Sequence, residues 1–219
     1  MASYLAQRQS VADMSRYLAD HNYFSGTGGN IGVRVDTTVM AVTPSATDYY
    51  TIRAEDIVLL DLDTLKVIEG EKTPTIEKGL HARMLRVNRN RHASVHTHQP
   101  IASAVALLHA TLKWPEGSDL QLLGPQIDLV PYRPSGTGML AKAFEKALKP
   151  GTYAYLLASH GVICAGRDLK EAVDMIRRID AAAAAHLRDL ASTRTTLDRH
   201  LKSLVTSVLE HAGKMGEAR

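Results

Sequence analysis

The stretch HASVHTHQPIASAVALLHA, residues 92–110, changes from strand to helix and decides the fold class. Its first seven residues, 92–98, have the character of a strand. Pro100 then suits the first turn of a helix, where a missing N–H costs nothing. Before this stretch, residues 77–89 space their apolar side chains as a helix does. A strand between two helices indicates an α/β domain.

The same two patterns continue outward in both directions. Helices are also expected at 3–21, 136–148, from Asp168 through 191, and roughly at 194–212, and strands at 31–35, 38–44, twice within 56–70, at 126–132 and within 152–166. We therefore predict an α/β (α-β-α layered) fold, a sheet with helices on both faces. The 219 residues are expected to form one domain, 1–219, in which 190–219 is a helical tail.

The bulk composition excludes several classes of function. The formal charge of +3 is small and its basic residues are scattered, so no nucleic-acid partner is expected. No apolar run has the length of a signal peptide or a membrane span, so no membrane is expected. The single cysteine, Cys164, allows no internal disulfide and suits the core of a protein in a reducing, cytoplasmic compartment.

Two histidines mark the first candidate site. His96 and His98 are two apart on a predicted strand, so their side chains point to the same face. Neutral imidazole is a common zinc ligand, but two imidazoles do not complete the tetrahedral coordination of the ion, so a third ligand is expected. His160, where Gly161 permits a sharp turn after a strand, is the best third candidate. The alternative is that these histidines only bond to backbone carbonyls.

A metal site of this kind also needs a group that transfers protons. Glu77 stands at the start of a predicted helix, immediately before the histidine strand. The alternative is an ordinary first-turn glutamate, favoured there by the helix dipole. His81 lies one helical turn later and has no assigned role.

Three loops rich in glycine or hydroxyl groups are candidates for anion binding. SGTGGN, residues 25–30, fails the dinucleotide motif because position 31 is isoleucine and a strand follows. Its backbone can still form an anion-binding nest with Thr27 and Asn30. The segments TPS at 43–45 and TPT at 73–75 could converge with it on a phosphate, or all three could be ordinary turns.

Five motifs in this order resemble the class II aldolase/adducin family, with the closest likeness to its L-fuculose-phosphate aldolase branch. The resemblance extends from about residue 5 to about 190. The motifs are GTGGNIGVR, VTPSATDY, TPTIEKGLH, HTH and SHGVICAGRDLKEA.

The resemblance implies a central, mostly antiparallel sheet flanked by helices, and a homotetramer with active sites between subunits. It implies Zn²⁺, with Mn²⁺ or Co²⁺ as alternatives, as the cofactor. The metal ligands would be His96, His98 and His160, and Glu77 would be the catalytic acid/base. Phosphate binding would fall to Thr27, Asn30, Ser45 and Thr75.

The implied activity is that of a zinc-dependent lyase acting on a sugar phosphate. Retro-aldol cleavage of a ketose 1-phosphate would give dihydroxyacetone phosphate and an aldehyde. A decarboxylase or dehydratase on the same metal site stays open, and VPYRPSGT resembles the decarboxylase branch equally well. Glu77 argues against a 4-epimerase, which resembles a pattern with aspartate there. The full ligand set argues against a non-catalytic, adducin-like module.

The chain also departs from the aldolase pattern. Gly32 and Ile76 stand where the aldolases usually have serine, and Ala46 where they have glycine. Ile76 removes a hydroxyl donor from the expected phosphate pocket. No tyrosine follows Tyr155, and Tyr132 lies within the PY segment itself, so the group that handles the aldehyde is unassigned.

Overall fold

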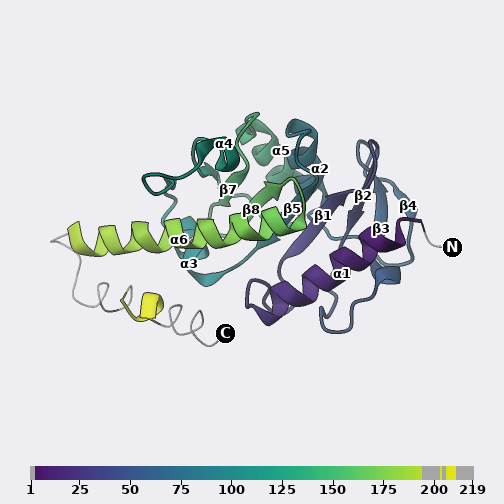
Figure 1. The fold of residues 1–219 in the computed structure, drawn as a ribbon, viewed down its shortest axis with the longest axis horizontal. Coiled ribbons are helices and arrows are strands. Elements are labelled where there is room, and N and C mark those ends of the chain that lie inside the picture. The colour runs from purple at the N-terminus through teal and green to yellow at the C-terminus, as the bar shows by residue number, and fades with distance from the viewer. Residues whose placement is uncertain (1–2, 194–202, 204–205, 211–219) are drawn as a thin grey trace.

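A single eight-stranded sheet runs through the protein (Figure 1). The computed structural model describes residues 3–193, 203 and 206–210. The order of strands across the sheet is β4-β3-β2-β1-β5-β8-β7-β6. The strands are β1 (Asn30–Arg34), β2 (Val39–Val42), β3 (Val58–Asp61), β4 (Val67–Glu69), β5 (Ala93–Thr97), β6 (Asp128–Val130), β7 (Ala154–Leu157) and β8 (Gly161–Gly166).

The sheet is antiparallel except at one edge. Only β6 and β7 pair in parallel, with Asp128 opposite Tyr155. In the centre, β5 lies between β1 and β8, so that His96 is opposite both Asn30 and Ile163. The predicted sheet is thus confirmed as mostly antiparallel, and its middle strand carries the first histidine of the candidate site.

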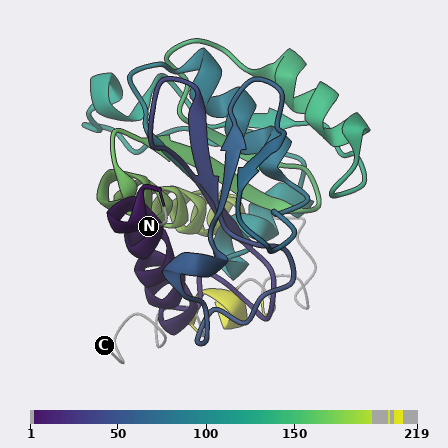
Figure 2. The ribbon, with the colours of Figure 1, turned by 90° about the vertical axis from the view of Figure 1, so that its right-hand side faces the viewer.

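Helices cover both faces of this sheet (Figure 2). The helices are α1 (Leu5–Asp20), η1 (Ala54–Asp56), α2 (Lys78–Val87), α3 (Pro100–Leu107), α4 (Leu120–Leu123), α5 (Gly138–Ala147) and α6 (Leu169–Thr193). Figure 2 shows α1 and α6 on one side of the sheet and α5 on the other. The predicted α/β layers are therefore confirmed.

The alternation of side chains along β8 explains the two layers. Cys164 points into the core under α6, where its thiol lies 3.3 Å from the carbonyl oxygen of Ala172. Its neighbour Ile163 points the other way and packs with Met84 of α2 and Phe144 of α5. Because successive side chains in a strand face opposite ways, a strand buried on both faces is apolar throughout.

Most of the predicted elements are confirmed within a few residues. The Asp168 carboxylate accepts a hydrogen bond of 2.7 Å from the Glu171 N–H, and α6 begins after this cap, as expected. The short helices η1 and α4 were not predicted. Of the helix predicted at 194–212, Ser203 and residues 206–210 are helical and the rest lies outside the described residues. The assignment of 1–219 to one domain stays a prediction.

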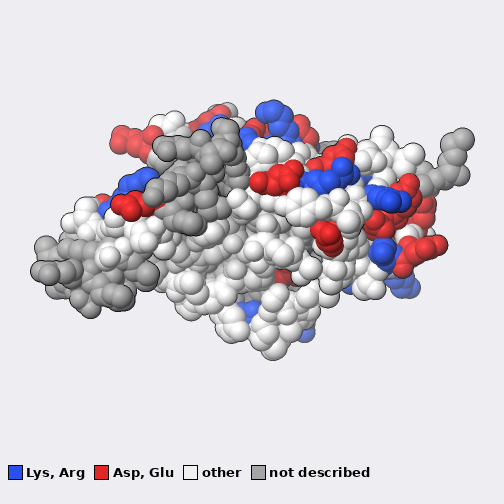
Figure 3. Space-filling model, turned by 90° about the horizontal axis from the view of Figure 1, so that it is seen from below, with Lys and Arg blue, Asp and Glu red and all other residues white. Residues whose placement is uncertain are grey.

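Charged side chains of both signs are interspersed along the upper part and the right-hand end of the face seen in Figure 3, and the lower middle carries few of them. None of the helices in the described part of the chain has the length and apolarity needed to cross a bilayer.

Candidate active site

The three predicted histidines come together at one end of the sheet. His96 is on β5, His98 follows that strand, and His160 lies in the turn between β7 and β8. Because β5 and β8 are antiparallel neighbours, the end of β5 adjoins the start of β8. The centroids of the three rings are 4.7, 4.7 and 5.0 Å apart, and one nitrogen of each lies within 4.8 Å of the others.

The turn that carries His160 differs from the expectation in one detail. The left-handed residue is Ser159, with φ of 53°, and not Gly161. A Cβ atom at Gly161 would lie 2.5 Å from the Thr97 carbonyl oxygen and 2.8 Å from the His98 ring. Position 161 therefore requires glycine because the histidine strand passes so close to it.

The atoms that converge here suit a divalent cation. His96 Nδ1 lies 2.7 Å from the Val162 carbonyl, to which it must donate, so its Nε2 carries a lone pair. That nitrogen faces His98 Nε2 at 2.8 Å and a carboxylate oxygen of Glu77 at 3.2 Å. Acceptors that face one another need a cation or a proton between them, and imidazole nitrogen is a preferred ligand of zinc.

The histidines are held in the neutral form that binds metals. Burial lowers the pKa of His96, whose ring is inaccessible to solvent. Burial also lowers the pKa of His98, with a further contribution from the neighbouring His160, and it lowers that of His160 itself. A neutral imidazole leaves one nitrogen free to bind an ion.

Glu77 lies directly against this cluster. It occupies the N-cap position of α2, but its side chain makes no capping hydrogen bond and instead places one carboxylate oxygen 3.3 Å from His160 Nε2. Asn30 Nδ2 and the Ser135 hydroxyl each donate to the carboxylate over 2.9 Å. Burial alone raises the pKa of this carboxyl, but the facing His96 and these hydrogen bonds outweigh it and leave the pKa below its usual range.

A buried histidine, His81, is linked to the Glu77 carboxylate through Asn30. His81 on α2 lies 2.6 Å from Asn30 Oδ1 through Nε2 and 2.9 Å from Ser94 Oγ through Nδ1. Sequence reasoning left His81 without a role and missed Ser135 entirely. For His81, the available signal was its position one helical turn after Glu77. Ser135 comes from a distant loop, and the sequence offers no such signal.

The predicted phosphate loops also adjoin one another. Ser45 N–H donates to the Thr73 carbonyl at 2.8 Å, and Thr75 N–H to the Thr43 carbonyl at 3.0 Å. Tyr49, which follows the 43–45 segment in the chain, holds the glycine loop by sharing its single O–H between the Gly29 carbonyl and the more distant Thr27 carbonyl.

The four candidate phosphate residues fall into two pairs. Thr27 is exposed and Ser45 is half-buried, so both can reach a ligand. Asn30 and Thr75 are buried, and both contact Glu77: Thr75 Oγ1 accepts from the Glu77 N–H at 3.2 Å. The structure thus turns Asn30 and Thr75 toward Glu77, while Thr27 lines a cavity that His98 also borders.

A cavity of about 690 Å³ adjoins the histidines on the His98 side. Thr27 of the glycine loop, Asp48 and Tyr50 are among the residues that line it. This space has the size of a small-molecule site.

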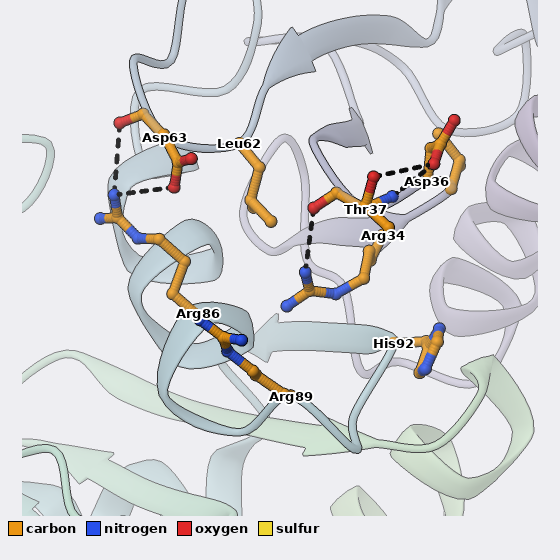
Figure 4. Close-up of a pocket in the computed structure, with 9 residues that line it drawn as sticks. Arg34, Asp36, Thr37, Leu62, Asp63, Arg86, Arg89 and His92 are labelled. Atoms are coloured by element: carbon orange, nitrogen blue, oxygen red, sulfur yellow. Dashed lines mark hydrogen bonds and ion pairs between the residues drawn. The ribbon is translucent and has the colours of Figure 1, made fainter.

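A second cavity, of about 550 Å³, lies at the other end of β1 (Figure 4). It is lined mainly by arginines and aspartates. Arg34 donates to the Leu85 and Thr37 carbonyls, and Arg86 pairs with Asp63. Because two of its cations are already bonded within the protein, this cavity is a weaker candidate than the histidine cluster.

The comparisons with known proteins agree with this geometry. Residues 9–187 match the model of the class II aldolase and adducin N-terminal domain. A 5-deoxy-D-ribulose 1-phosphate aldolase of Bacillus thuringiensis serovar kurstaki is 34% identical over 180 residues, which are 81% of this chain and 82% of that protein. An L-fuculose phosphate aldolase of Methanocaldococcus jannaschii is 30% identical over 84% of this chain and 97% of its own length.

Solved structures and other relatives extend the comparison. The structure of an L-fuculose 1-phosphate aldolase superposes with a TM-score of 0.76 at 27% identity, covering 96% of this chain and 98% of that one. The relatives also include a 3-oxo-tetronate 4-phosphate decarboxylase and a methylthioribulose-1-phosphate dehydratase. The match over 179 residues, together with the fold and the arrangement of the histidines, shows that the chain belongs to the class II aldolase/adducin family.

Proposed function

We propose that this protein is a metal-dependent aldolase that cleaves a ketose 1-phosphate into dihydroxyacetone phosphate and an aldehyde. The observation that carries the proposal is the convergence of three neutral imidazoles, two of which face the Glu77 carboxylate, beside a cavity bordered by a glycine loop. The aldolases among its relatives support the same reaction class.

His96, His98 and His160 would hold the cation, with Zn²⁺ proposed and Mn²⁺ or Co²⁺ as alternatives. A bound divalent cation would supply Lewis-acid stabilisation of negative charge on the substrate oxygens. The Val162 carbonyl contributes by accepting from His96 Nδ1, which fixes the tautomer and orients the ring.

Glu77 would be the acid/base at the substrate carbon. When the bond between C3 and C4 breaks, the C4 hydroxyl would release its proton to solvent and C4 would become the aldehyde, while the electron pair stays with C3. Glu77, ionised at rest, would take up one proton from solvent and give it to C3 to form dihydroxyacetone phosphate, so that no net proton is gained or lost; in the reverse direction it would remove the C3 proton. Asn30 and Ser135 hold the carboxylate in place from two sides.

Thr27 and Ser45 would bind the phosphate through their accessible hydroxyls, with Asn30 and Thr75 completing the pocket from its buried side. Ile76 is 60% exposed and packs toward Gly136. We propose that it limits the size of the group bound at the mouth of the pocket.

A decarboxylase or dehydratase activity on the same site is the second candidate. The observation that keeps it open is Ser135: the VPYRPSGT segment, which resembles the decarboxylase branch about as well as the aldolases, contacts Glu77 directly through this serine. Relatives of both kinds, 26% and 27% identical, support keeping this alternative.

We also propose a cytoplasmic homotetramer. Exposed apolar side chains on the segments that carry Glu77 and Ser135 support the assembly: Ile76, Tyr132 and Met139 are 60%, 52% and 55% exposed. The single reduced cysteine supports the compartment.

Exchange of solvent deuterium into dihydroxyacetone phosphate, followed by NMR, tests the function. The zinc-loaded protein is expected to exchange one C3 proton. His160→Ala should lose both bound metal and exchange, as should the wild type after chelation. Glu77→Gln should keep its metal and lose exchange by at least about 100-fold, because a general base typically contributes this much.

Exchange at the wild-type rate by Glu77→Gln would contradict the acid/base assignment. A protein without a tightly bound divalent metal, and indifferent to chelators, would contradict the lyase as a whole. Incubation with 5-deoxy-D-ribulose 1-phosphate and with 3-oxo-tetronate 4-phosphate separates the two candidates. Release of carbon dioxide from the second, without aldol cleavage of the first, would select the decarboxylase.

A further inference from the structure

His81 is fully buried between α2 and the two central strands, without a contact to the metal-binding nitrogens. Its ring is held from both ends, by Asn30 of β1 and by Ser94 of β5. The space it fills is opened by Gly32, which lies opposite Ser94 in the sheet: a Cβ atom at position 32 would approach His81 Cβ to 2.6 Å.

Each hydrogen bond in this chain of groups has only one direction. A carboxylate only accepts hydrogen bonds, so Asn30 turns its Nδ2 group toward Glu77 and its Oδ1 toward His81. Since Oδ1 only accepts, His81 must donate from Nε2. Burial lowers the pKa of His81 to about 4, which leaves a neutral ring with a single N–H. Its Nδ1 therefore accepts from the Ser94 hydroxyl.

We propose that His81 is a positioning residue: by donating from Nε2 to Asn30, it locks the Asn30 amide with its N–H group on Glu77 and thereby fixes the carboxylate for proton transfer. The proposal rests on the proposed function of Glu77. An unrestrained amide could rotate and present Oδ1 to the carboxylate, and two acceptors in contact repel each other.

A double-mutant cycle with Asn30 tests this inference. His81→Leu is expected to lower kcat for deuterium exchange into dihydroxyacetone phosphate by about 10- to 100-fold, the usual cost of removing such a supporting hydrogen bond. Bound zinc should stay within about twofold, because His81 hydrogen-bonds to Asn30 and Ser94 and to none of the three metal-binding histidines. KM should change less than kcat, because Thr27 and Ser45, the accessible members of the proposed phosphate pocket, do not depend on His81. In an Asn30→Ala background, His81→Leu should leave kcat almost unchanged, because the hydrogen bond between His81 and Asn30 is already absent.

His81→Gln is the conservative variant and should recover most of the rate. Its amide can donate to Asn30 from one atom and accept from Ser94 with the other. His186→Leu removes a half-buried histidine from α6, which packs against the opposite face of the sheet, and should leave kcat unchanged. A purely structural role for His81 would instead lower folding stability and kcat to the same degree in both backgrounds.

NMR of the metal-free protein gives a readout that needs no activity. The ¹⁵N shifts of His81 should identify the Nε2–H tautomer, and the Asn30 side-chain amide protons should exchange with solvent faster in His81→Leu and in His81→Ala. An Nδ1–H tautomer, unchanged amide exchange, or additive losses in the cycle would overturn the proposal. Absence of deuterium exchange in the wild type would overturn only the proposed function, and the NMR result would still decide the orientation of Asn30.

Discussion

At position 32, the lack of a side chain leaves the space that the His81 ring occupies. The Cβ atom of an alanine there would lie 2.6 Å from His81 Cβ and 2.8 Å from Cγ, so the helix or the strand would have to shift. A glycine that makes room for another residue has a different role from one that provides a turn, and the two respond differently to substitution.

Gly32→Ala is expected to lower the free energy of unfolding by about 1–3 kcal/mol, the usual cost of overpacking a core. Gly138→Ala is the matched control: it lies at the first turn of α5, and a Cβ atom there meets nothing within 4 Å. It should be neutral or slightly stabilising because alanine favours helix. Urea unfolding of both variants measures the difference, and equal stabilities would contradict the packing argument.

At this scale, alternation along one strand was enough to place His96 and His98 on the same face. His160 and Glu77 were predicted through the order of the family motifs, because their proximity depends on which strands pair. The orientation of the Asn30 amide depends on His81 and Glu77 together. No local pattern in the sequence contains that information.

At the scale of elements, the contact between α6 and α3 contains a buried carboxylate. Asp180 Oδ1 accepts a hydrogen bond of 3.2 Å from the Ala102 N–H in the first turn of α3. Burial raises the pKa of Asp180 to about 6. At neutral pH the buried Asp180 carboxylate is therefore ionised, and the cost of burying its charge lowers the stability of the folded state.

The raised pKa predicts how stability depends on pH. Between the unfolded pKa, near 3.8, and about 6, the folded state binds more protons, so this group lowers stability as the pH rises through that window. Asp180→Asn keeps the acceptor and removes the charge. Its stability relative to wild type should increase by about 1–2 kcal/mol from pH 4 to pH 6 and level off near pH 7, about one unit above the folded pKa.

Urea unfolding at pH 4, 5, 6 and 7 measures this difference. Asp20→Asn, which changes an exposed carboxylate at the end of α1, serves as the control and should show no such trend. A constant difference between Asp180→Asn and wild type across the range would show that Asp180 is ionised throughout.

Most elements were predictable because their apolar residues repeat with the period of a helix or a strand over many residues. The helices η1 and α4 have three and four residues, which is too short for a period to appear. The parallel pairing of β6 with β7 could not be predicted either, because the periodicity within one strand does not indicate which strand lies next to it in the sheet.

At the scale of the whole molecule, three large apolar side chains are exposed on the segments that carry Glu77 and Ser135. Ile76, Tyr132 and Met139 are each more than half exposed. Large exposed apolar side chains are typical of surfaces that another protein chain covers.

Light scattering after size-exclusion chromatography is expected to give the mass of four chains of 23.9 kDa each. Met139→Glu should shift the population to smaller species, since a buried unpaired charge is costly at an interface. Val67→Glu, at a residue 51% exposed on β4, is the control and should leave the mass unchanged. A wild-type monomer at micromolar concentration would contradict the proposed assembly.

The burial of the single thiol under α6 has a practical consequence. Burial raises the pKa of Cys164, and its Sγ is fully enclosed by the core. A thiol reagent can reach it only after α6 has separated from the sheet. The rate at which Cys164 is labelled in native buffer therefore reports how often α6 separates from the sheet, and no probe has to be introduced to measure it.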